Sequence, residues 1–111
     1  MRSYHIDELD PEHIQLFKDF LQQEDLAGPI EDIYWLIIPR ELLTAEQKEH
    51  EPECGPYFLS LETGDEWLNL ELLVRCRGRM RCSCIQYATE DQRVYAMNLL
   101  DTMLKNRDIP V

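Results

Sequence analysis

The sequence predicts an α+β fold in which two long helices pack on one face of a four-stranded, mainly antiparallel sheet. Two observations lead to this class. Apolar residues recur at helical spacing near both ends of the chain, and they alternate with polar residues between positions 57 and 87. Such alternation is typical of antiparallel strands with one buried face. The chain of 111 residues is expected to form a single globular domain, 1–111, with one core.

The first long helix is expected over about 11–26. Asp10 is a good N-cap and Pro11 favours the first helical position, so together they predict where the helix begins. Gly28 and Pro29 would interrupt it at the other end.

A strand is expected to follow over the apolar run 33–38, which stops at Pro39. Residues 40–56 then form a long connection. Thr44 precedes good helix formers, and we therefore place a short helix within this connection.

Residues 57–87 are predicted to form a three-stranded meander. Gly64 and Asp65 suit a two-residue turn, which places Leu61 opposite Leu68. A second hairpin, with a three-residue loop over 77–79, continues the same alternation of buried and exposed positions.

The second long helix is expected over 90–106. Thr89 and Gln92 match a capping box, in which each side chain bonds the backbone of the other residue. The apolar positions that follow lie at helical spacing and end before Pro110.

Charge limits the classes of partner. The chain has 22 acidic residues against 11 Lys and Arg, a formal net charge of -11. Such acidity repels nucleic acid and anionic membranes at long range, so neither is an expected partner. The sequence has no apolar run long enough to span a bilayer, and no apolar signal at its start, so the expected location is cytoplasmic.

An arginine cluster stands out against this acidity. Arg75 and Arg81 are expected to lie opposite each other on the exposed face, with the other two arginines in the loop between them. Fixed guanidinium groups suit carboxylates or phosphates, so an anionic counterpart is expected: either the chain's own acidic segment 46–53 or an external phosphate or acidic peptide. The cluster comprises Arg75, Arg77, Arg79 and Arg81.

The outer face of the sheet also carries large apolar residues. Phe58, Trp67 and Tyr87 fall on it in the predicted register, and Trp35 is a further candidate. A sheet face exposed to solvent does not usually carry so many aromatic residues, so either segment 40–56 or another protein chain is expected to lie over it.

The cysteines offer a different kind of site. His50 and Cys54 are four residues apart and precede three cysteines of the second hairpin, Cys76, Cys82 and Cys84. In an extended strand the last two sulfurs would lie about 7 Å apart, which is unsuitable for chelation by that pair. We therefore expect reduced, metal-free cysteines that belong to the core, with Cys54 the most accessible, and no cofactor.

We expect a non-enzymatic protein-binding domain, because no motif with a catalytic mechanism is present. It would form a homodimer or bind another protein through the aromatic sheet face and the arginine hairpin. The alternatives are an anion- or nucleic-acid-binding module that uses the arginines, and a metal or thiol site built from the cysteines and His50.

Overall fold

The computed structural model describes residues 1–111 and shows an α+β fold with three α-helices and one antiparallel sheet of six strands. The predicted class is confirmed, whereas the predicted count of four strands is wrong. The elements in chain order are β1 (Ser3–Ile6), α1 (Pro11–Gln23), β2 (Ile33–Ile37), the 3₁₀ turn η1 (Arg40–Leu42), α2 (Ala45–Cys54), β3 (Tyr57–Thr63), β4 (Leu68–Glu71), β5 (Leu73–Cys76), β6 (Gln86–Tyr87) and α3 (Glu90–Asn106).

Strand β3 organises the sheet. It pairs with β2 along one edge, and along the other edge with β4 and then β5. The outer neighbours of β4 and β5 are β1 and β6, respectively. The change of neighbour occurs at Leu72, whose N–H donates to the carbonyl of Arg2 while its own carbonyl accepts from Ala88. The single strand predicted from Leu68 to Cys76 is therefore two strands, β4 and β5. The break occurs because β1 binds the outer edge of β4 and β6 binds the outer edge of β5.

The helix starts follow the sequence closely. Asp10 accepts a hydrogen bond from the Glu12 N–H at 2.8 Å, and the capping box of Thr89 and Gln92 is formed in both directions. A second capping box at Thr44 and Gln47 begins α2, which the sequence predicted only as a short helix. Helix α1 ends at Gln23 rather than near position 26.

The register of the first hairpin differs from the prediction by two residues. Leu61 lies opposite Leu70 rather than Leu68, because residues 64–67 form a four-residue connection. The Trp67 ring lies against Gly64, where a Cβ atom would collide with it, and the Gly64 N–H donates to the Trp67 carbonyl at 2.9 Å. An even shift keeps every side chain on its predicted face.

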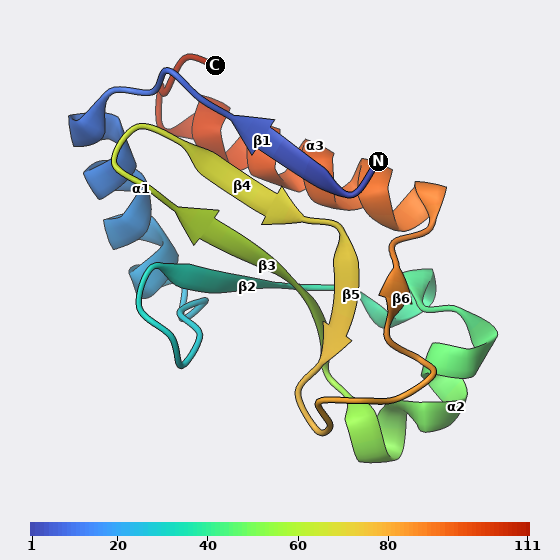
Figure 1. Ribbon diagram of the computed structural model, residues 1–111. Helices are drawn as coiled ribbons and strands as arrows, with labels where there is room; N and C mark the ends of the chain where they lie inside the picture. Colours follow the sequence, from blue (N-terminus) through green and yellow to red (C-terminus); the bar gives the residue numbers. More distant parts are fainter.

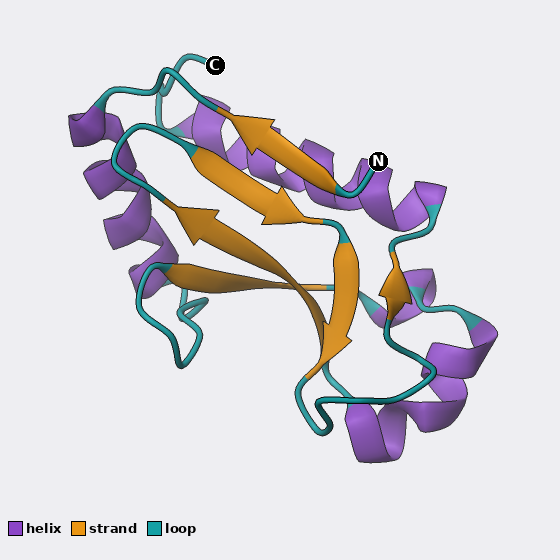
Figure 2. Ribbon diagram, viewed as in Figure 1, coloured by secondary structure: helices purple, strands orange, loops and turns teal.

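The third strand of the meander is mostly absent. Only Gln86 and Tyr87 pair with β5, and residues 77–85 form a loop. Within this loop the Ile85 N–H donates to the Cys82 carbonyl at 3.1 Å, which closes a turn where an extended strand was predicted. Figure 2 shows the loop passing beside α2.

The core lies between one face of the sheet and the helices. In Figure 1 α3 runs behind β1 and β4, and no helix crosses the front of β2, β3 and β4. Fully buried residues come from the sheet, α1 and α3: Phe17, Leu21, Leu59, Leu61, Leu68, Leu70, Leu72, Val74, Leu100 and Leu104. No helix is both long and apolar enough to cross a membrane.

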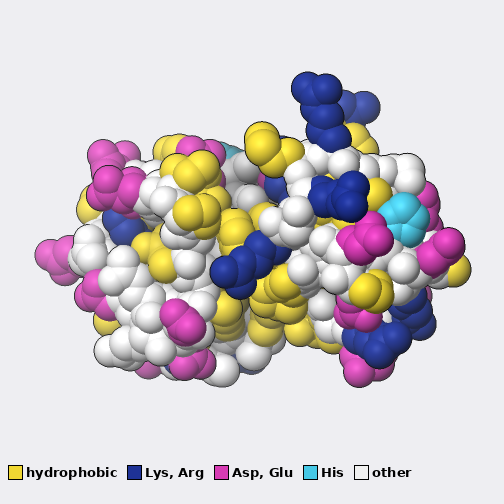
Figure 3. Space-filling view, turned by 90° about the horizontal axis from the view of Figure 1, so that it is seen from below, with side chains coloured by type: hydrophobic (Ala, Val, Ile, Leu, Met, Phe, Trp, Pro, Cys, Tyr) yellow, Lys and Arg dark blue, Asp and Glu magenta, His cyan; other side chains and the backbone are white.

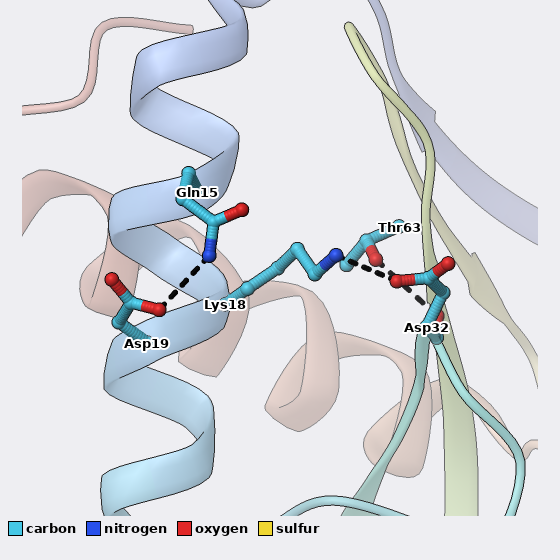
Figure 4. A network of polar contacts seen from close by, with 5 residues as sticks. All are labelled: Gln15, Lys18, Asp19, Asp32 and Thr63. Atoms are coloured by element: carbon cyan, nitrogen blue, oxygen red, sulfur yellow. Dashed lines mark hydrogen bonds and ion pairs between the residues drawn. The ribbon is translucent and has the colours of Figure 1, made fainter.

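Polar contacts tie α1 to the sheet and α2 to α3. The Lys18 ammonium of α1 lies 2.6 Å from the Asp32 carboxylate, and the Thr63 hydroxyl donates to the Asp32 carbonyl at 3.3 Å (Figure 4). The Thr63 N–H donates to the same carbonyl at 2.9 Å. At the other end, Gln92 of α3 is fully buried and donates to the Leu42 carbonyl at 2.8 Å and to the Gln47 side chain at 3.0 Å. These contacts fix α1 against the β2–β3 end and α2 against α3.

Truncation of Leu70 should test which face of the sheet is buried. Leu70→Ala removes a side chain with no exposed surface and should lower the free energy of unfolding by about 2–5 kcal/mol. Leu16→Ala, at a half-exposed site on α1, is the control. Urea unfolding measures both, and a cost below about 0.5 kcal/mol for Leu70→Ala would contradict the face assignment.

The junction between α2 and α3 should depend on Gln92. Gln92→Leu keeps the approximate volume but removes the donors to Leu42 and Gln47, so stability should fall by about 1–3 kcal/mol. Gln22→Leu, on the exposed side of α1, should change stability by less than about 0.5 kcal/mol. Thermal unfolding that treats both variants alike would contradict a role for the junction.

Candidate functional site

Two parts of the structure have side chains that could bind a ligand or partner and are not needed to form the core. One is the open face of the sheet, and the other is the contact between α2 and the 77–85 loop. The predicted interaction residues are divided among four places and do not form one patch.

The open face is concave around β2 and β3. Its groove has a volume of about 370 Å³ and is lined by Pro29, Ile30, Ile33, Trp35, Phe58, Ser60, Glu62, Asn69, Glu71 and Arg75. No residue of segment 40–56 is among them, so this segment, one of the two covers that the sequence left open, does not line the groove: Leu43 is buried in the core instead. Figure 3 shows the molecule from below, with hydrophobic side chains gathered in a hollow near its centre and basic side chains beside them.

The floor of the groove is a stacked aromatic pair. The rings of Trp35 and Phe58 lie with their centroids 3.9 Å apart and their planes at 15°. Phe58 is only 5% exposed because Trp35 covers it. The apolar surface continues past Trp35 to Ile37, which is 43% exposed, and to Ile30, which is 63% exposed. Pro29 and Ile30 were not predicted as part of this surface, because their only signal in the sequence is an apolar residue within a Pro-containing turn.

The rim of the groove is polar. Arg75 makes two hydrogen bonds to Glu71, at 2.8 and 3.3 Å, and this ion pair raises the pKa of the guanidinium. Glu62 has no such partner among the ion pairs of the structure. Because one acid neutralises the one arginine, the rim has a negative balance.

The other aromatic candidates lie elsewhere. Trp67 stacks on His5 at 5.6 Å, at the β3–β4 connection, and Tyr87 lies at the β6 edge with the Arg2 guanidinium 4.9 Å from its ring. Neither lines the groove.

The arginine cluster is also divided. Arg75 faces Phe58 across the sheet, so the predicted Arg75–Arg81 pair is wrong, since Arg81 lies in the 77–85 loop. In that loop Arg79 binds Glu53 of α2 at 3.1 Å, a residue of the acidic segment that the sequence offered as an internal counterpart. Both side chains are exposed, so this pair contributes little to stability.

The cysteine–histidine cluster joins α2 to the loop. It consists of His50, Cys54, Cys82 and Cys84, and their potential ligand atoms all lie within 4.8 Å of one another. His50 and Cys54 are one helical turn apart at the end of α2. Cys82 and Cys84 converge because the loop turns there, so the sequence-based objection to chelation, which assumed an extended strand, is wrong.

Hydrogen bonds set the protonation of this cluster. The Cys84 N–H and thiol, and then His50, act on the Cys82 sulfur and lower the pKa of Cys82 to about 6. The His50 Nδ1 atom lies 3.0 Å from that sulfur, and this contact raises the pKa of the imidazole. Burial raises the pKa of Cys84 to about 11.

Cys76 is the cysteine that the cluster leaves out. Its thiol donates to the Arg79 carbonyl at 3.1 Å. Cys54 is 1% exposed, so its predicted accessibility is wrong: it closes α2 and faces the core.

Comparison with known protein families, curated proteins and solved structures finds no match for this chain. The groove and the cysteine–histidine cluster are therefore the two features of the molecule that bear on its function.

Cysteine modification should follow burial. In the presence of a chelator, Cys82 should react first with iodoacetamide, because it alone of the four cysteines is not buried. The other three should react only as the protein unfolds. Peptide mass spectrometry over a time course gives the order, and early modification of Cys54 would contradict the structure.

Proposed function

We propose that this chain is a non-enzymatic binding module whose open sheet face receives an apolar segment of a basic protein. The observation that carries the proposal is the aromatic groove on the face that no helix of the chain covers. Exposed apolar surface with a polar rim, in a concave site, is typical of an interaction site.

Charge supports a basic partner over a second copy of the chain. The free acid on the rim, Glu62, and the net charge of -11 both attract Lys and Arg side chains. Two copies would bring like charges together, which disfavours but does not forbid the homodimer expected from the sequence. Nucleic acid fits this rim poorly, because phosphates would meet the same acids.

The shape of the groove also favours an extended segment. The floor follows two neighbouring strands, β2 and β3, whose outward side chains alternate with buried ones. An extended peptide can place every second side chain into such a surface. The Trp35–Phe58 pair offers the kind of rigid aromatic anchor that contributes most binding energy at interfaces.

A peptide-display library panned in parallel on three proteins should test the proposal. Ser60→Arg places a long cation in the groove and should abolish enrichment of peptides that combine Lys or Arg with apolar residues. Wild type and Val94→Arg, which carries the same new charge on α3, should enrich the same peptides. Circular dichroism confirms that the variants are folded.

Two outcomes would contradict the proposal. Equal enrichment on Ser60→Arg and wild type would place binding outside the groove. Sedimentation of wild type as a dimer and of Ser60→Arg as a monomer would identify the occupant as a second copy of this chain.

A further inference from the structure

The 77–85 loop is the longest segment between strands without regular structure, and it lies against α2. The Gly78 N–H donates to the Cys54 carbonyl at 2.8 Å, and a Cβ atom at Gly78 would collide with the Glu53 carbonyl. Further along, Ser83 and Gln86 both donate to the Glu46 carboxylate. The loop is thus held on α2 at its beginning and at its end, and the cysteine–histidine cluster lies between these contacts.

The cluster has the composition of a zinc site. Three thiols and one imidazole are a ligand set that tetrahedral zinc commonly takes, and these soft donors disfavour magnesium and calcium. Four protein ligands would leave no coordination position open, as is typical of structural sites.

The distances also fit. A tetrahedron with zinc–sulfur bonds of about 2.3 Å has sulfur–sulfur edges of about 3.8 Å. The ligand atoms lie within 4.8 Å of one another, so the widest pair needs to close by about 1 Å. His50 Nδ1 and Cys82 Sγ, at 3.0 Å, would separate slightly to reach an edge of about 3.6 Å.

The loop that carries Cys82 and Cys84 also carries positive charge. Three thiolates on one zinc ion leave a net negative charge, and the loop brings three cations close to it in sequence, Arg77, Arg79 and Arg81. The negative charge of such a site would account for the concentration of positive charge in this loop of an otherwise acidic chain.

We infer that the cysteine–histidine cluster is a structural zinc site that fixes the 77–85 loop on α2. The metal replaces the thiol protons and cross-links two segments that are otherwise joined by a few hydrogen bonds. The inference is independent of the open sheet face, which lies on β2 and β3.

The first experiment measures the metal and its ligands in the unmodified chain. Protein purified under reducing conditions with zinc in the medium should contain one zinc ion per chain by elemental analysis. X-ray absorption at the zinc edge should show three sulfurs and one nitrogen. Four sulfurs would mean that Cys76 replaces His50, and would overturn the proposed ligand set.

Variants separate the ligand cysteines from the one beside them. Cys82→Ala should lose zinc, and Cys76→Ala, which removes the thiol nearest the cluster but outside it, should retain it. Equal retention or equal loss of zinc by the two variants would contradict the site. A disulfide involving Cys82 in protein purified without reductant, together with no zinc uptake by the reduced chain, would instead identify a thiol redox pair.

The effect on the loop can be read by limited trypsin digestion, because Arg77, Arg79 and Arg81 are cleavage sites within it. At a free zinc concentration about a hundred times the Kd, only about 1% of the chains are metal-free, so cleavage should slow about 100-fold relative to chelator-treated protein. Cys76→Ala should show the same protection. Equal cleavage rates with and without zinc would overturn the role assigned to the metal.

Discussion

The fold depends on one-sided burial of the sheet. Leu59 and Leu61 of β3 and Leu70 of β4 point into a core closed by α1 and α3, and none of them has exposed surface. All the helical cover is on that side, so the free energy of burial is concentrated in a single layer between sheet and helices. The opposite face contributes less to stability, and its residues are free to serve binding.

The part of the structure formed by α2 and the 77–85 loop is organised differently. Helix α2 and the 77–85 loop have few large apolar side chains between them, and side-chain hydrogen bonds hold them together. The buried amide of Gln47 illustrates this: it accepts from Thr44 and Gln92 and donates to the Cys84 carbonyl. Such polar junctions give a defined geometry but little free energy. A cross-link through four ligands would make up for this shortage, and for this reason the cysteine–histidine cluster and the loop are best understood together.

The sequence predicted what depends on local chemistry and periodicity, and failed where tertiary contacts decide. Capping residues placed the starts of α1 and α3, and alternation assigned the faces of β3 and β4 even though Trp67 shifted their register. The strand expected through Cys82 and Cys84 does not exist, because contacts with α2 hold that segment in a loop. The α2 residues that make these contacts lie some 30 positions earlier in the sequence, so local patterns could not predict them. Strand β1 was missed because four residues with modest alternation give little signal without the β4 edge that binds them.

One face of the sheet is buried and the other is open, and the two faces can be compared within the single strand β2. Ile37 is 43% exposed, whereas its neighbour Leu36 is 2% exposed. With a soluble paramagnetic probe added to dilute protein, the methyl signals of Ile37 should broaden strongly while those of Leu36 stay sharp. Equal protection of the two residues would mean that something covers the groove in the isolated protein, and equal broadening would mean that the core side is not closed.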